Sequence, residues 1–118
     1  MSLESDLLAL LGSSFAGRLF PDVAPANTTR PYGTWQQVGG ESVTFVEAAK
    51  ASKKNARIQI NVWGITRLEA NAKARAIEDL MVANAPLQAT ALGAFTAVYE
   101  EDTKLYGTRQ DFSVWFTD

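Results

Sequence analysis

The sequence predicts an α+β domain in which two helices pack on an antiparallel sheet. Three observations predict this fold class: a two-residue alternation of aliphatic side chains over 57–63, a helical period directly after it, and two extended runs near the C-terminal end. The expected order is α-β-β-β-α-β-β, with a β-meander before the second helix and a β-hairpin after it. Because 118 residues suit one hydrophobic core, residues 1–118 are expected to form a single domain.

The first part of the chain predicts one helix, one long loop and two strands. The helix should begin after Ser2 and bury a leucine stripe made of Leu3, Leu7, Leu10 and Leu11. Prolines among small polar residues favour an extended loop over 21–31. Residues 32–38 and 43–46 are expected to be strands separated by Gly39-Gly40, and 47–56 a loop.

The most informative stretch is 57–80, where a strand pattern changes to a helix pattern across Gly64. Thr66 and Glu69 have the T-x-x-E spacing of a capping box, so a helix should begin at Arg67 and end before Pro86. The apolar stripe expected to face the sheet consists of Leu68, Ala72, Ala76 and Leu80, with Ile77 and Met81 beside it.

The C-terminal segment predicts a closing hairpin. Its two runs, 94–100 and 106–116, are joined by a polar connection at 101–105. Phe112, Val114 and Phe116 alternate with polar residues and should share one buried face.

Composition excludes several classes of function. The chain has no cysteine and no histidine, which removes disulfides, thiolate nucleophiles, imidazole bases and the usual zinc and haem ligands. A net charge of −2 gives no basic footprint for holding duplex DNA. No apolar run is long enough to span a bilayer, and Glu4 and Asp6 occupy the region where a signal peptide would be basic, so we expect a protein made in the cytosol, without a membrane partner.

Several short motifs follow one another in a set order: the leucine-rich first helix, Leu19-Phe20-Pro21, Ala24-Pro25, Pro31-Tyr32, the run Arg57–Gly64, and Thr66 with Glu69-Ala70. This order resembles the small tail completion proteins of phages and prophages, also described as tail-to-head joining or tail terminator proteins. The resemblance is carried by roughly the first 80 residues, and the final hairpin matches only in general pattern. Gly33 and Thr34 depart from it, because they stand where such strands usually carry bulky residues.

This resemblance implies a structural protein rather than an enzyme. It implies a hexameric ring at the head-proximal end of the tail tube that terminates the tail and joins it to the head connector. The implied partners are other copies of the chain, the tail tube protein and the connector, with at most passing contact with DNA. The implied location is the host cytoplasm during assembly and the tail–head junction of the virion afterwards. No catalytic residue, cofactor or metal is implied.

Strand parity places tryptophans opposite the aliphatic stripes. Trp63 shares a strand face with Arg57, Gln59 and Asn61, and Trp115 lies on the polar side of the last strand. Trp35, next to Gln36 and two residues before Gln37, is a third candidate. These residues either cover a second core layer or form a subunit interface, since interfaces concentrate aromatic side chains.

Two other groups of side chains have competing interpretations. Lys50, Lys53 and Lys54 belong either to a solvated loop or to a surface that meets the lumen or a partner in the ring. Carboxylates at 78, 79 and 100–102 fit helix solvation and protection of a strand edge. The alternative from another functional class is a ligand-binding or enzymatic domain with carboxylates and Tyr32, Tyr99 or Tyr106 in a pocket between helices and sheet.

Overall fold

The computed structural model describes residues 3–41, 54–84 and 87–116. Its elements, in chain order, are α1 (Leu3–Leu11), the 3-10 helix η1 (Gly12–Phe15), β1 (Leu19–Pro21), β2 (Tyr32–Gln37), β3 (Lys54–Gly64), α2 (Arg67–Ala83), β4 (Thr90–Ala91), β5 (Thr96–Glu100) and β6 (Leu105–Phe116). The predicted α+β class is confirmed. The strand expected at 43–46 lies outside the described residues.

One sheet organises the molecule. Its strands follow the order β1-β2-β3-β6, and β4 and β5 both pair with β6. All pairs are antiparallel except β1 with β2, which is parallel. The β3–β6 ladder is the longest, running from Lys54 opposite Phe116 to Gly64 opposite Tyr106. This ladder makes the molecule elongated, with extents of 52 × 26 × 25 Å.

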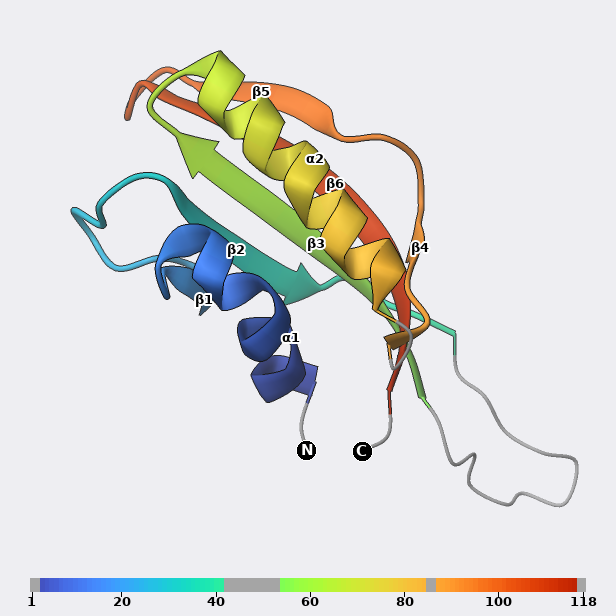
Figure 1. Cartoon of the computed structure of the whole chain (residues 1–118). Coiled ribbons are helices and arrows are strands. Elements are labelled where there is room, and N and C mark those ends of the chain that lie inside the picture. The colour runs from blue at the N-terminus through green and yellow to red at the C-terminus, as the bar shows by residue number, and fades with distance from the viewer. Residues whose placement is uncertain (1–2, 42–53, 85–86, 117–118) are drawn as a thin grey trace, which may run out of the picture.

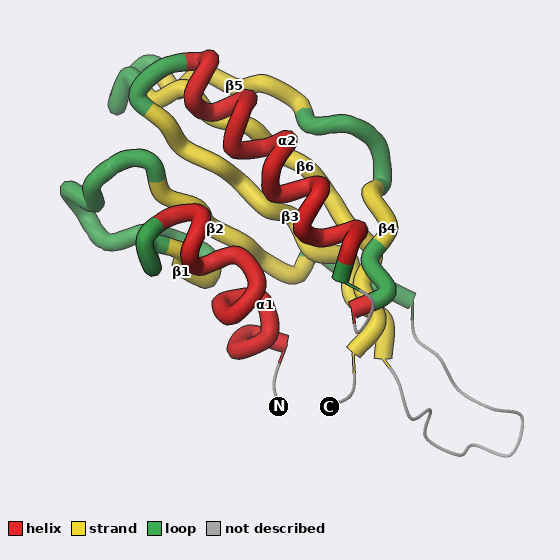
Figure 2. Tube along the Cα trace, in the orientation of Figure 1, coloured by secondary structure: helices red, strands yellow, loops and turns green. Residues whose placement is uncertain are grey.

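Both helices lie on the same face of the sheet. Figure 1 shows α1 over β1 and β2, and α2 running along β3 and β6. Figure 2 shows the same layering, with the two helices together on one side and the strands behind them. No helix of the described residues covers the opposite face of the sheet, and we call it the open sheet face.

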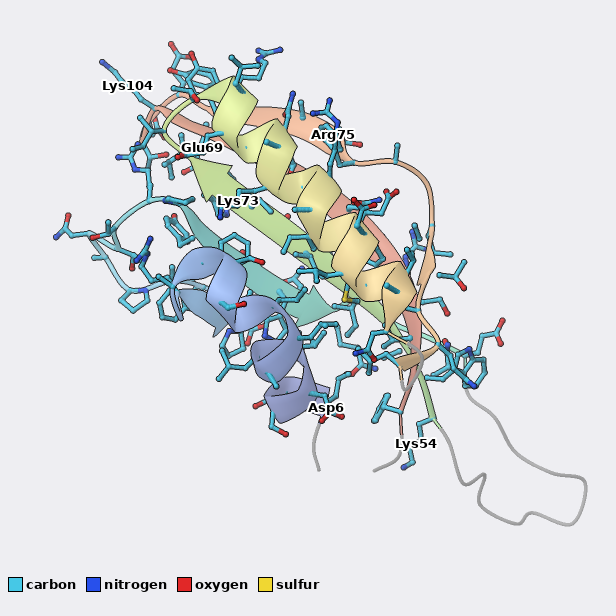
Figure 3. All side chains as sticks on the ribbon, in the orientation of Figure 1. Asp6, Lys54, Glu69, Lys73, Arg75 and Lys104 are labelled. Atoms are coloured by element: carbon cyan, nitrogen blue, oxygen red, sulfur yellow. The ribbon has the colours of Figure 1, made fainter. Side chains whose placement is uncertain are left out.

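The core fills the space between the helices and the sheet. It contains leucines from α1, Phe15 from η1, Phe112 and Val114 from β6, and four residues of β3: Ala56, Ile58, Ile60 and Val62. Lys73 lies between the helices: its ammonium donates to the Ser14 carbonyl and stands 5.9 Å from the centre of the Phe15 ring. Figure 3 shows Lys73 on the α1 side of α2 and Arg75 on the side toward β5, where Arg75 stacks on Phe95.

The capping box predicted from sequence is present at the start of α2. The Glu69 amide donates to the Thr66 hydroxyl at 3.1 Å, and the Ile65 amide donates to the Glu69 carboxylate at 2.8 Å. The Glu69 amide, which the first helical turn leaves unpaired, and the Ile65 amide just before the N-cap are therefore both satisfied. This fixes the helix start at Arg67, as predicted.

The prediction of which α2 stripe is buried was wrong for its four main residues and right for Ile77 and Met81, which were expected beside it. The buried residues are Ala70, Ala74, Ile77 and Met81. Leu68 is 83% exposed, Ala72 and Ala76 are exposed, and Leu80 is 37% exposed. The buried residues follow a 4-3-4 spacing and the predicted ones a 4-4-4 spacing, and the two sets point about 150° apart around a helix with 3.6 residues per turn. Periodicity alone therefore could not decide which one faces the sheet.

Two short strands were missed, and one strand begins earlier than expected. β1 contains only three residues and pairs with β2, which is distant in sequence, while β4 contains only two residues. Such short segments depend on tertiary pairing rather than on a local pattern. Residues 54–56, predicted as the end of a loop, are the first residues of β3, because they continue the ladder with β6.

Candidate functional site

The open sheet face is the candidate site, and strand parity determines which side chains it carries. Adjacent positions across β2, β3 and β6 are fixed by the register, so the odd-numbered residues of β3 align with even-numbered residues of β2 and odd-numbered residues of β6. The face comprises Tyr32, Thr34, Gln36, Asn55, Arg57, Gln59, Asn61, Trp63, Gly107, Arg109, Asp111, Ser113 and Trp115. The structure thus brings Arg57, Gln59, Asn61, Trp63 and Trp115 together on one surface, as parity predicted.

The middle of this face is a cross-strand polar network. Arg57 forms an ion pair with Asp111 at 2.7 Å, and Gln59 donates to the same carboxylate at 3.2 Å. Because Arg57 is about half exposed, this pair contributes little to stability, and it mainly fixes the positions of the two side chains. Because the Asp111 carboxylate is already paired within its own chain, a partner protein can cover this polar band, Arg57, Gln59 and Asp111, without leaving the carboxylate unpaired.

One end of the face is aromatic. Trp63 pairs across the ladder with Gly107, and its ring lies so close that a Cβ at position 107 would be 2.6 Å from it. Gly107 is therefore needed for the indole to lie flat on β6. Trp63 is half-buried, and Tyr32 stands beside it on β2. Partial burial raises the pKa of Tyr32, Glu100 raises it further, and Arg30 acts in the opposite direction.

The other end of the face is hollowed beside Trp115. The hollow has a volume of about 360 Å³ and is lined by Gly40, Glu41, Asn55, Arg57, Leu92, Ser113 and Trp115. Asn55 forms its floor, since its amide donates to the Ser113 hydroxyl at 2.9 Å and accepts from the Glu41 amide at 2.8 Å. Its lining combines one indole and one exposed leucine with polar groups, which suits an aliphatic side chain from a partner.

The placement of Trp35 corrects the prediction. Trp35 is only 8% exposed and lies in the core, because it pairs with Ile60 on the helix-covered face. Gln37 has the same parity as Trp35 but is exposed at the end of β2. Its polarity therefore did not indicate the face to which Trp35 belongs, and Trp35 is not part of the open sheet face.

Of the three lysines predicted to face a lumen or a partner, the structure describes Lys54 alone. Lys50 and Lys53 lie outside the described residues. Lys54 is the first residue of β3, is exposed, and appears at the far end of the strand in Figure 3. A role for these lysines toward a lumen or partner stays a prediction.

The three tyrosines proposed for a catalytic or ligand pocket do not converge. Tyr32 lies on the open sheet face, whereas Tyr99 and Tyr106 are paired across β5 and β6 with ring centres 4.9 Å apart. None of the three lines the hollow beside Trp115. Within 3–41, 54–84 and 87–116, no cluster of three or more acidic side chains is placed to hold a metal ion. No helix in those ranges is long and apolar enough to cross a membrane.

Sequence reasoning missed two features that bear on the site. The hollow includes Leu92, whose position next to β6 depends on the short β4 pairing. The outward side of α2 carries an apolar stripe that was expected to be buried. The sequence does contain a signal for this exposed stripe. The helix α2 has two apolar stripes, and because a sheet covers only one side of a helix, one of the two must stay uncovered by it.

One family model matches nearly the whole chain. It is described as tail completion protein gp17 and matches residues 3–117. Among solved structures, the chain is similar to one in the virion of a native gene transfer agent particle, with a TM-score of 0.55 and 20% sequence identity. That alignment covers 98% of this chain and 89% of the other. At this identity the likeness concerns the fold. A search of curated proteins found no match.

Proposed function

Because the chain belongs to the family of the tail completion protein gp17, we propose that it forms a ring at the head-proximal end of the tail tube. The ring stops growth of the tube and joins the tail to the head connector. Its partners are other copies of the chain, the tail tube protein and a connector protein. The protein assembles in the host cytoplasm and remains at the tail–head junction of the virion, and it acts as a structural component without a catalytic step.

The open sheet face is the observation that carries this proposal. It combines a half-buried tryptophan at one end, a hollow beside a second tryptophan at the other, and a polar band with internal pairing between them. Exposed aromatic side chains together with internally paired polar groups on one surface are typical of protein interfaces. A ring of hexameric type requires such a surface on every copy.

Termination of tube growth can be measured with purified components. A tail tube protein from the same phage or prophage would be polymerised with and without the purified chain, and tube lengths would be measured by negative-stain electron microscopy. We expect capped tubes that stop growing soon after the chain is added, with extra density at one end. A matched control is Val23→Ser, which changes a 76% exposed valine away from the open sheet face and should cap normally. Tubes that keep growing past the addition would contradict the proposal.

A further inference from the structure

The side of α2 that faces away from the sheet is the most unusual surface of the molecule. It carries Leu68, Ala72, Ala76, Asp79 and Ala83, all exposed, and we call this stripe the outer ridge. Leu68 at 83% is the most exposed large apolar side chain among the described residues. The opposite side of the same helix is fully used in the core. A helix that is apolar on two sides is typical of a helix buried between two layers.

The outer ridge and the open sheet face lie on opposite sides of the molecule. Both helices cover one face of the sheet, so the ridge points away from it on one side and the open sheet face is uncovered on the other (Figures 1 and 2). A head-to-tail ring needs two different complementary patches on opposite parts of each copy. Stacking the ridge of one copy on the open sheet face of the next would give every sheet a helix layer on both faces.

The open sheet face is long enough to hold the ridge. From Leu68 to Ala83 the ridge spans 15 residues, or about 22 Å at 1.5 Å per residue. From Gly107 to Trp115 the open sheet face spans eight residues of β6, or about 27 Å at 3.4 Å per residue. The small side chains Ala72, Ala76 and Ala83 allow the helix backbone to approach a sheet closely, as Ala70 and Ala74 do on the buried side.

Two contacts fix the register of this docking. Asp79 and Arg109 are exposed, and neither is in an ion pair with another residue that the structure describes. Leu68 is about 16 Å from Asp79 along the helix. The hollow between Ser113 and Trp115 is about 14 to 20 Å from Arg109 along β6. When Asp79 meets Arg109, Leu68 therefore reaches the hollow.

We propose that the outer ridge of α2 docks on the open sheet face of a second copy, with Leu68 in the hollow beside Trp115 and Asp79 paired with Arg109. This inference rests on the proposed ring, and it assigns the two surfaces by which successive copies join. The order is heterologous: each copy offers its ridge to one neighbour and its open sheet face to the other.

The absence of cysteine makes cross-linking a direct test of the register. Ala72→Cys on the ridge and Ser113→Cys on the open sheet face are small changes on surfaces that the register brings together. Under mild oxidation, the double variant should form a ladder of disulfide-linked oligomers on non-reducing gels. Each single variant should remain monomeric on the same gels. A dimer from Ala72→Cys alone would mean that ridges pair with each other, and would overturn the inference.

Charge exchange tests the same contact without a cross-link. Arg109→Glu and Asp79→Lys should each weaken self-association by about tenfold or more, because each leaves like charges facing one another. The combined variant should recover most of the loss, which a folding defect would not do. Association would be measured by light scattering after size exclusion, with circular dichroism as the check on folding.

The outcomes separate this inference from the proposed ring. An oligomeric wild-type chain with neither cross-linking nor charge rescue would overturn the docking surfaces and leave the ring intact. Cross-linking of either cysteine variant to the tube protein through a thiol-to-amine reagent, but not to a second copy, would assign that surface to the tube and also overturn the inference. A chain that stays monomeric in solution and on tube ends would remove the proposed ring, and the inference with it.

Discussion

Phe112→Ala should lower the free energy of unfolding by about 3 to 5 kcal/mol, the usual cost of removing a buried aromatic side chain. Phe112 is fully buried and lies opposite Ile58 on β3 and Ala91 on β4. It is therefore in contact with the main ladder and with the short strand that closes the far edge of β6. Since small domains are stable by about 5 to 15 kcal/mol in total, this loss is large.

Urea unfolding followed by tryptophan fluorescence measures this change. Trp35 is buried in the same core and should report the loss of packing. Val23→Ala is the matched control, since its side chain is 76% exposed and its loss should change stability by less than about 0.5 kcal/mol. A loss below about 1 kcal/mol for Phe112→Ala would show that the sheet and helices do not pack around this residue as described.

Trp63→Ala should weaken self-association by about 30-fold or more, while costing less stability than Phe112→Ala. The effect on association follows the cost of at least 2 kcal/mol typical of an aromatic hot spot. The smaller effect on stability follows from exposure: Trp63 is half-buried and packs on the backbone at Gly107 rather than in the core. Sedimentation velocity across a concentration series would give the association constant, and thermal unfolding of the monomer would give the stability.

A matched control tests whether the effect is specific to the open sheet face or follows from removing any exposed aromatic side chain. Tyr99→Ala removes a 49% exposed aromatic side chain from β5, outside the open sheet face, and should leave association unchanged. If Trp63→Ala instead unfolds the monomer by several kcal/mol, the indole belongs to the core and the interface hypothesis for it fails.

The local signals in this sequence were enough to define the strand-to-helix unit. The alternation of Ile58, Ile60 and Val62 places β3, and the Thr66–Glu69 capping box places the first residue of α2, because both depend on neighbours within a few positions. The parity of β3 also brought Trp63 and the polar band onto one face correctly.

Features that depend on contacts between distant segments could not be predicted from those signals. Leu68 was expected to be buried because its stripe is as regular as that of Ala70, and only the position of the sheet distinguishes the two. Trp35 was a candidate for the open sheet face because polar Gln37 shares its parity. The hollow forms where β4, β6 and the segment after β2 meet, so no single segment indicates it.

Deletion of the gene in an inducible lysogen tests whether this chain completes the tail. Lysates would be examined by negative-stain electron microscopy, with a plasmid copy of the wild-type gene as the rescue control. We predict overlong tails, or separate full heads and unjoined tails, with normal particles restored by the plasmid. Intact, infectious particles from the deletion strain would contradict the claim.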